Sequence, residues 1–521
     1  MANTSEYNKK PKEIKDGHLS LADEILSFPK IQGALPSKEN LLNLADAALA
    51  AFSEAVEKIK QHPAGLGKTE RTQLQDALKD VSAKTEILEN ITLQLGRILD
   101  YDNLKKEGAT AQNIADYVAQ DDKTLAKAKT FTQKNHQIRE QMFGYPVSLH
   151  YDTAITAYLR KMETKLCIIN NCGDSYETSN FLIDAKVDYE QPILNEIYKH
   201  LGLNPPEITV TEHIAPDGTK TKTVDYKGPW GYITPGGSES NQWGISNGLR
   251  KYPNAVVYYS KAAHYSVPKA VINFRESEPV NTQADSEKID VDELLCKVKN
   301  NWDLYQKPAV IVLTWGTTKT GAIDDVSLIS KRLKALNIAH YIHLDAALYG
   351  GIAKNQQTAP VLPDLEKAGV DSVCMSLHKY FGSTGINSVV VARQKPHCDY
   401  VDYIGITDTT IAGSRGFSPF STWQRVVETL ERKNTGDYIK NVAFFDKLLR
   451  ENHIEFSREE NANIFVINKP ADAICKKYQL STFKKTDNNE KAHIIIFPYH
   501  TEQKMRALVW DLAEDNRANA K

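Results

Sequence analysis

Short runs of apolar, mostly β-branched residues alternate with helical stretches from about residue 144 to 395, and this alternation constrains the fold more than any other feature. A helix is predicted over 326–336, with Asp324 and Asp325 as candidate N-caps. Strands that alternate with helices build βαβ units, so the sequence predicts an α/β fold with a mostly parallel central sheet covered on both faces. The strand-like runs are 255–259, 309–313, 341–344, 372–375 and 388–391.

The pattern changes on both sides of this region, which predicts three domains. Residues 1–140 form a helical N-terminal region, residues 141–398 the large α/β domain, and residues 399–521 a small C-terminal α/β domain. The N-terminal helices are expected near 41–52, 71–99 and 113–142. The C-terminal domain is expected to hold helices near 420–450 and 501–516 and strands near 463–468 and 492–497.

Composition argues against several classes of partner. Lys plus Arg number 64 and Asp plus Glu 66, so a net charge of −2 offers no general attraction for nucleic acid or an anionic membrane. The longest apolar runs, such as 309–313, are too short to span a bilayer, and residues 1–17 lack the apolar core of a secretory signal. Six cysteines without a CxxC pair or zinc spacing predict reduced thiols, no metal site and a cytoplasmic protein.

Lys379 follows the strand-like run 372–375 in the segment Ser376-Leu377-His378-Lys379. A lysine just past a buried strand is partly desolvated, which lowers its amine pKa and makes it a nucleophile toward carbonyls. Taken alone, a lysine in this position is more often an ordinary surface residue in a loop.

Asp345 ends the next strand-like run upstream, and Ala346 and Ala347 follow it. A carboxylate at a strand terminus can pair with a ligand cation such as a protonated ring nitrogen, and two small residues let a flat ring approach the backbone. Taken alone, Asp345 is more often the N-cap of the following helix.

Three further segments follow predicted strands, where open α/β sheets bind ligands. Gly236-Gly237-Ser238 leads into a helix and can bind a phosphate through free amides, or form only a tight turn. His264 can stack on an aromatic ligand or be a structural histidine, and Thr317 can bond a ligand oxygen or belong to a strand-to-helix turn. Together with Lys379 and Asp345, these are the parts that pyridoxal 5'-phosphate (PLP) requires.

The same segments, in this order, resemble those of the group II PLP-dependent amino-acid decarboxylases, most closely the bacterial histidine decarboxylases and plant serine decarboxylases. The likeness covers about residues 140–515 and rests on six segments. They are 231–239, 259–266, 316–325, 343–347, 376–379 and 410–415. The resemblance implies the PLP-dependent transferase fold of type I, which is aspartate aminotransferase-like.

The resemblance also implies a role for each site residue. Lys379 would bind PLP covalently, Asp345 would keep the ring nitrogen protonated, and His264 would stack on the ring, with Ala347 beside it. Thr317 would support Asp345 or the ring hydroxyl. The phosphate would be surrounded by Gly237, Ser238, Ser376 and His378.

Related enzymes complete each active site across a homodimer interface and use a tyrosine on a mobile loop as proton donor. Tyr403 is the candidate here, and Gly413-Ser414 would belong to the partner's site. Tyr403 alone is equally a packed tyrosine. The segment 170–174 is expected to line the substrate mouth.

The predicted function is decarboxylation of an L-amino acid to its amine, with histidine as first substrate and serine or another polar or aromatic amino acid as the alternative. A PLP-dependent carbon–carbon lyase, an aldehyde-forming enzyme and a non-enzymatic scaffold remain competing hypotheses. Three features depart from the family pattern: the long N-terminal helical region, a hairpin-like insert at 207–228, and Gly416-Phe417 after Arg415, where asparagine-glycine is usual.

Overall fold

The computed structural model describes most of the region after residue 104 and two parts before it. The described residues are 38–60, 91, 103, 105–146, 172–177, 185–214, 220–272, 276–352, 361–383, 385–401, 403, 406–411, 415–432, 436–484 and 489–519. The chain divides into two compact units, residues 1–136 and 137–521. The first unit contains α2 (Lys38–Lys60) and most of α4 (Ala111–Glu140), which are two of the predicted helices. The third, at 71–99, lies outside the described residues apart from residue 91.

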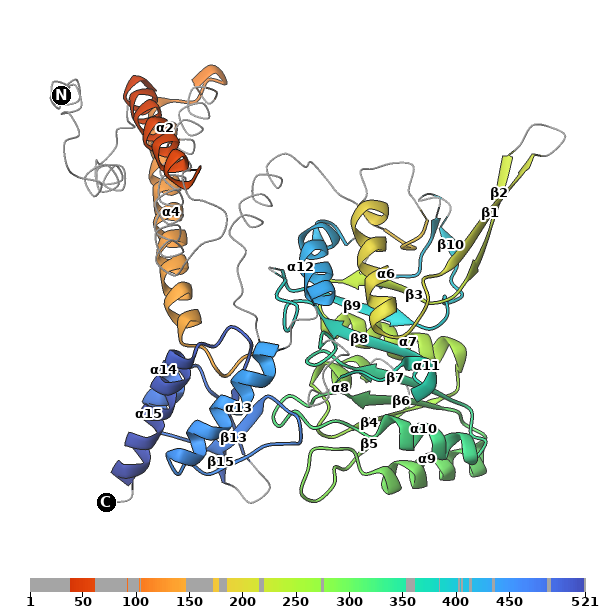
Figure 1. The fold of residues 1–521 in the computed structure, drawn as a ribbon. Helices are drawn as coiled ribbons and strands as arrows, with labels where there is room; N and C mark the ends of the chain where they lie inside the picture. Colours follow the sequence, from red (N-terminus) through yellow and green to blue (C-terminus); the bar gives the residue numbers. More distant parts are fainter. Residues whose placement is uncertain are drawn as a thin grey trace. The chain divides into compact units, whose positions relative to one another are not determined.

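A seven-stranded sheet organises the second unit, in the order β3-β9-β8-β7-β6-β4-β5 (Figure 1). Only β9 runs antiparallel to its neighbours, so the predicted mostly parallel sheet is confirmed. The strands are β3 (Trp230–Thr234), β4 (Val256–Ser260), β5 (Ser277–Val280), β6 (Ala309–Thr314), β7 (His340–Asp345), β8 (Ser372–Ser376) and β9 (Ser388–Ala392).

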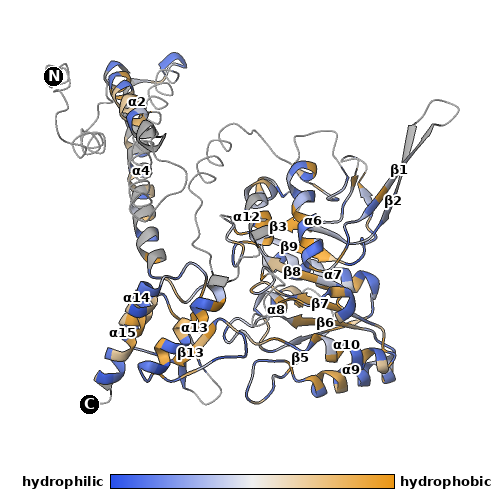
Figure 2. Cartoon of the chain, in the orientation of Figure 1, coloured by the Kyte–Doolittle hydropathy of each residue, from blue (hydrophilic) through white to orange (hydrophobic). Residues whose placement is uncertain are grey.

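Alternate residues of each strand pack into different cores, as the two-residue period of a strand requires. Ile311 and Leu313 of β6 join the core that contains residues of α6 (Gln191–His200), α9 (Val291–Tyr305), α10 (Val326–Ala335) and α12 (Ser418–Arg432). Val310 and Val312 join the core with α7 (Gly237–Lys251) and α8 (Ser266–Val271). Figure 2 shows the strands as largely hydrophobic, while the covering helices also carry hydrophilic residues.

Of the two candidate N-caps for α10, Asp325 is the one observed: its carboxylate accepts from the Leu328 amide at 3.0 Å. Asp324 is buried instead and accepts from the Ile289 and Thr314 amides, both at 2.7 Å. It therefore fixes the turn after β6 rather than starting the helix.

A second, antiparallel sheet of four strands carries the C-terminal part, in the order β12-β13-β15-β14. Its strands are β12 (Phe456–Ser457), β13 (Ile464–Asn468), β14 (Ser481–Lys484) and β15 (Glu490–Ile495), and its helices are α13 (Gly436–Glu451), α14 (Asp472–Lys477) and α15 (Glu502–Asn519). The predicted helices near 420–450 and 501–516 and the two predicted strands are present. The edge strands β12 and β14 carry no strong apolar pattern and were not predicted.

The insert at 207–228 is a β-hairpin, as predicted. β1 (Glu207–Ile214) pairs antiparallel with β2 (Lys220–Lys227), and Figure 1 shows the hairpin extending away from the central sheet. Within the described residues, no helix is long and apolar enough to cross a membrane. No group of three His, Cys, Asp or Glu side chains in that same part of the chain could hold a metal ion.

Candidate active site

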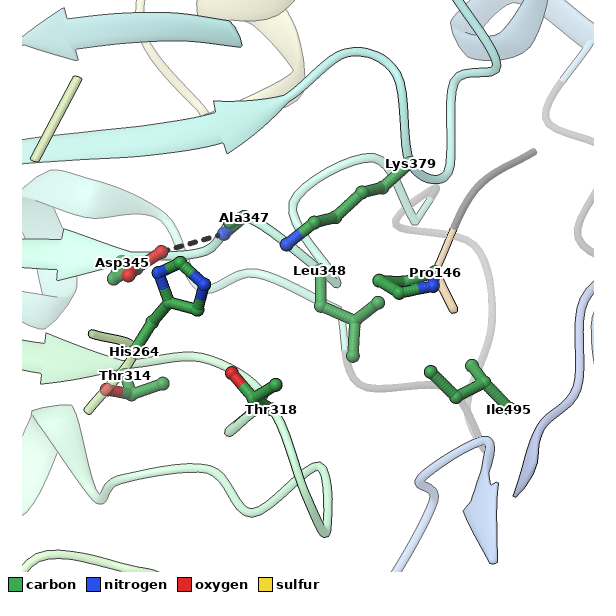
Figure 3. Close-up of a pocket in the computed structure, with 10 residues that line it drawn as sticks. Pro146, His264, Thr314, Thr318, Asp345, Ala347, Leu348, Lys379 and Ile495 are labelled. Atoms are coloured by element: carbon green, nitrogen blue, oxygen red, sulfur yellow. Dashed lines mark hydrogen bonds between the residues drawn. The ribbon is translucent and has the colours of Figure 1, made fainter. Parts of the chain in front are cut away.

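A pocket opens at the carboxyl ends of the parallel strands β4, β6, β7 and β8 and holds about 400 Å³ of empty space, counting its open mouth. Its lining combines segments that are far apart in the sequence (Figure 3). The lining residues are Pro146, His264, Thr314, Gly316, Thr318, Asp345, Ala347, Leu348, Lys379 and Ile495. Lys379, Asp345, His264 and Ala347 of the predicted site therefore share one pocket.

Lys379 lies just beyond the carboxyl end of β8, and Figure 3 shows its side chain reaching toward Asp345 and His264. Burial lowers the pKa of its amine, while the carboxylate of Asp345 and the thiol of Cys374 raise it in part. An amine with a lowered pKa is more often unprotonated, which is the form that attacks a carbonyl carbon.

Asp345 ends β7 and is only 4% exposed. One carboxylate oxygen accepts from Nδ2 of Asn241 at 2.8 Å, and the other accepts from the Ala347 amide at 3.1 Å. The sulfur of Cys374 lies close by, 3.4 Å from the carboxylate. Surrounding donors suit an ionised carboxylate, which can pair with a ligand cation.

His264 follows β4 and lies beside Asp345 in Figure 3. Its Nδ1 lies 2.9 Å from Oγ of Ser266, the first residue of α8. Burial lowers the pKa of the imidazole, against a smaller opposite effect of Asp345. A neutral ring held in this way can pack against a flat ligand.

Three of the four predicted phosphate-binding residues, Gly237, Ser238 and Ser376, meet at the start of α7. This helix begins at Gly237-Ser238, whose amides precede the first intrahelical hydrogen bonds. A Cβ added to Gly237 would lie 3.3 Å from Oγ of Ser376, so the glycine leaves space beside that hydroxyl. His378 is fixed by a contact of 2.9 Å between its Nδ1 and the Asn387 carbonyl oxygen.

Thr314 also lines the pocket and was not predicted from the sequence. Its Oγ1 is buried and has no hydrogen-bond partner among the described residues. Thr317, predicted to face the ligand, instead uses its hydroxyl in its own turn, where it accepts from the Ala322 amide at 3.0 Å and meets Thr320. An orphaned hydroxyl and a space beside Gly237 fit a bound group with polar atoms and a phosphate.

Among the described residues, the predicted proton donor Tyr403 does not line this pocket. Tyr403 is 81% exposed and lies in the turn between β10 (Tyr400–Val401) and β11 (Ile406–Thr407). Ser414 lies outside the described residues, as do residues 170 and 171.

Asp174, expected at the substrate mouth, is buried and bonded instead to Nε1 of Trp230 and Nζ of Lys395, both at 2.9 Å. Asn241 was also missed. Its place one turn into a helix after a glycine-rich turn is the signal that could have found it.

Comparisons with known proteins agree with this chemistry. The pyridoxal-dependent decarboxylase conserved domain matches residues 247–426. Histidine decarboxylase of Klebsiella aerogenes is 31% identical over 389 residues, which cover 71% of this chain and 92% of that protein. Histidine decarboxylase of Pseudomonas entomophila is 30% identical over 74% of this chain and 89% of that protein.

Solved structures support the fold alone. L-methionine decarboxylase from Streptomyces sp. 590 superposes with a TM-score of 0.61 at 22% identity, covering 76% of this chain and 95% of that chain. Tryptophan decarboxylase of Catharanthus roseus gives a TM-score of 0.54 at 17% identity, covering 73% and 83%. These likenesses confirm the predicted PLP-dependent transferase fold. The extent of the match to curated relatives shows that the chain belongs to the group II pyridoxal-dependent amino-acid decarboxylases.

Proposed function

We propose that this decarboxylase removes the α-carboxylate from L-histidine and releases the amine and carbon dioxide. The observation that carries the proposal is one pocket lined by Lys379, Asp345 and His264 in a chain that matches histidine decarboxylases over about nine tenths of their length. When bound, PLP supplies an electron-accepting ring that stabilises the carbanion left by the departing carboxylate.

Lys379 holds the cofactor through its amine, which burial keeps reactive. Asp345 holds a proton on the ring nitrogen, and the neutral imidazole of His264 packs on the ring. Ala347 leaves space for the ring beside the backbone, and Thr314 offers a hydroxyl to it. The phosphate is bound by Gly237, Ser238, Ser376 and His378. Thr317 shapes the turn that brings Thr318 to the pocket.

Tyr403 is the proposed proton donor, and Ser414 completes the site of a partner subunit in a homodimer. Exposed apolar side chains support this assembly: Tyr265, next to the pocket residue His264, is 69% exposed, and Ile386, beside Gly236 before α7, is 73% exposed. The free thiols of Cys296, Cys374, Cys398 and Cys475 fit a cytoplasmic protein.

The cofactor assignment is tested by colour and by reduction. Purified protein should be yellow, and borohydride should fix a pyridoxyl group on the peptide that contains Lys379. Lys379→Ala should abolish both signals, whereas Lys331→Ala, at an exposed lysine of α10, should change neither. Colourless protein that stays inactive with added PLP would support the scaffold hypothesis.

The substrate is tested by screening the twenty amino acids for carbon dioxide release, with Lys379→Ala as the blank. L-histidine should give the highest kcat/KM and yield one amine for each carbon dioxide. Preference for serine would overturn the substrate but keep the reaction class. Aldehyde and peroxide in place of amine would overturn the reaction.

A further inference from the structure

We infer that Asn241 and His343 are positioning residues that fix the Asp345 carboxylate in the direction of the cofactor ring nitrogen. Asn241 contacts Asp345 directly, and His343 acts through Asn241. The inference rests on the ring-nitrogen role proposed for Asp345. Neither residue lines the pocket, so both act from behind the site.

Asn241 lies in the second turn of α7, is 1% exposed and uses both amide hydrogens. Its Nδ2 donates to Oδ2 of Asp345 at 2.8 Å and to Oγ of Ser266 at 3.0 Å. The same Ser266 hydroxyl contacts Nδ1 of His264. The Asn241 amide therefore holds the Asp345 carboxylate directly and holds His264 through the Ser266 hydroxyl.

The oxygen of this amide faces the other way, toward His343 and Cys374. Nε2 of His343 lies 3.0 Å from Oδ1 of Asn241, and Sγ of Cys374 lies 3.1 Å from it. Because an amide oxygen only accepts, Nε2 of His343 must carry the hydrogen. Its Nδ1 is then free to accept from the Ser372 hydroxyl, 2.8 Å away.

Burial supports this arrangement, since it lowers the pKa of His343 to about 4 and keeps the imidazole neutral. Burial also raises the pKa of the Cys374 thiol, which therefore remains a donor. If the Asn241 amide rotated by half a turn, its oxygen would face the Asp345 carboxylate and repel it. His343 and Cys374 prevent that rotation, so the NH2 group of Asn241 stays turned toward Asp345.

The fold reserves space for His343 in this position. Tyr341, His343 and Asp345 alternate along β7, so they share the face of the sheet that α7 covers. Gly244 of α7 lies over the imidazole, and a Cβ added there would be 2.1 Å from its Nδ1. A helix with any side chain at this position could not pack on His343 as observed.

The test is the dissociation constant of PLP, measured by titrating cofactor-free protein and following absorbance. Asn241→Leu and His343→Leu should each weaken binding about tenfold or more, since each removes a buried hydrogen bond that leads to a charged group. His343→Gln, which can still donate toward Asn241, should recover most of the affinity. Because His343 acts through Asn241, the double Leu variant should bind no more weakly than Asn241→Leu alone.

Asn301→Leu is the matched control, because this part-buried amide also donates to a buried tyrosine, Tyr258, at 2.7 Å but lies outside the network. It should leave PLP affinity within about twofold of wild type. Ser372→Ala, which removes only the hydroxyl behind His343, replaces His343→Leu if that variant does not fold. It should weaken binding about threefold and add nothing to Asn241→Leu.

Additive effects in the double variant, or wild-type PLP affinity in both single variants, would overturn the inference and leave the proposed function intact. Wild-type protein that binds no PLP would overturn both. The two failures are therefore distinguished by the wild-type titration.

Discussion

His500 is 3% exposed, and the hydrogen bonds around it fix which of its nitrogens carries the proton. Its Nδ1 accepts from the Phe497 amide at 3.0 Å, so its Nε2 donates to the Met142 carbonyl at 3.1 Å. Protonation of Nδ1 would put its N–H opposite the Phe497 N–H, so that two donors would face each other without an acceptor. Burial lowers the pKa of the imidazole to about 3.

This lowered pKa predicts a loss of stability in acid that His500→Gln removes. Between about pH 3 and 6.5 the unfolded chain binds more protons at this residue than the folded chain, so stability is present above that range and lost as the pH falls. Subtracting the variant's free energy of unfolding from that of wild type isolates the effect of His500. This difference should fall by about 1.4 kcal/mol for each unit by which the pH is lowered through that range. Urea unfolding from pH 7 to 4.5 measures it, and parallel curves for the two proteins would contradict it.

At the residue scale, the sequence identified the groups with distinctive chemistry and missed the groups that orient them. Lys379, Asp345 and His264 each follow a strand, and parallel topology brings such residues to one edge of the sheet. Asn241 and Thr314 were missed because an asparagine one turn into a helix and a threonine at the end of a strand are too common to mark a site. Their roles depend on which residues face them across the core, and only the three-dimensional packing determines that.

Among the elements, a buried ion pair connects the segment after residue 414 to the rest of the unit. Arg415 donates to Glu190, the last residue of the π-helix η2 (Lys186–Glu190), with Nε 2.8 Å from Oε1, and both side chains are fully buried. Arg415 also donates to the Gly173 carbonyl at 2.9 Å, and Glu190 accepts from the Ile233 amide at 2.8 Å. Burial raises the pKa of Glu190, and Arg415 opposes that change.

Arg415→Met should lower the free energy of unfolding by about 3–5 kcal/mol, because it leaves a buried carboxylate without its cation. Arg415→Met with Glu190→Gln should be less destabilised than the single variant, since the buried charge is also removed. Arg450→Met, at an exposed pair with Asp446, is the control and should change the free energy of unfolding far less, because solvent screens that pair. Urea unfolding compares the four proteins, and equal losses for Arg415→Met and Arg450→Met would contradict the prediction.

The hairpin β1–β2 predicts tolerance of a deletion. Thr209 faces Asp225 in the observed register, so Asn-Gly in place of residues 210–224 would close a two-residue turn. Tyr226, which packs on Tyr176 at the base, is retained. Decarboxylase activity and the melting temperature should stay close to wild type, as differential scanning calorimetry and carbon dioxide release would show. A large loss of activity with an unchanged melting temperature would instead assign the hairpin a part in the reaction or in assembly.

The elements that the sequence predicted are those with a strong local signal. Runs such as 309–313 are apolar throughout because β6 is buried on both faces. The short strands β12 and β14 lie at sheet edges, where exposed positions interrupt the apolar pattern. Asp324 was assigned as a cap because it precedes a helix, and only the fold reveals that its carboxylate satisfies amides from two other segments.

At the scale of the whole molecule, the proposed proton donor lies outside the pocket. Tyr403 is 81% exposed and is not among the residues that line the pocket with Lys379. A tyrosine so exposed can reach reacting atoms if its loop moves over its own pocket or if it belongs to the site of a partner subunit. The two arrangements give opposite results when two inactive variants are mixed.

Lys379→Ala and Tyr403→Phe should each be nearly inactive, and a Tyr403 that serves the partner's site predicts that mixing them restores activity. In a mixed dimer, the site that keeps Lys379 receives an intact Tyr403 from its partner, while the other site carries both lesions. Random exchange makes half of the dimers mixed, so about a quarter of wild-type activity should return. Carbon dioxide release after refolding the two variants together measures it, and refolding each variant alone is the control. No recovery, with dimers present by analytical ultracentrifugation, would place Tyr403 over the pocket of its own chain, because both lesions then inactivate their own sites.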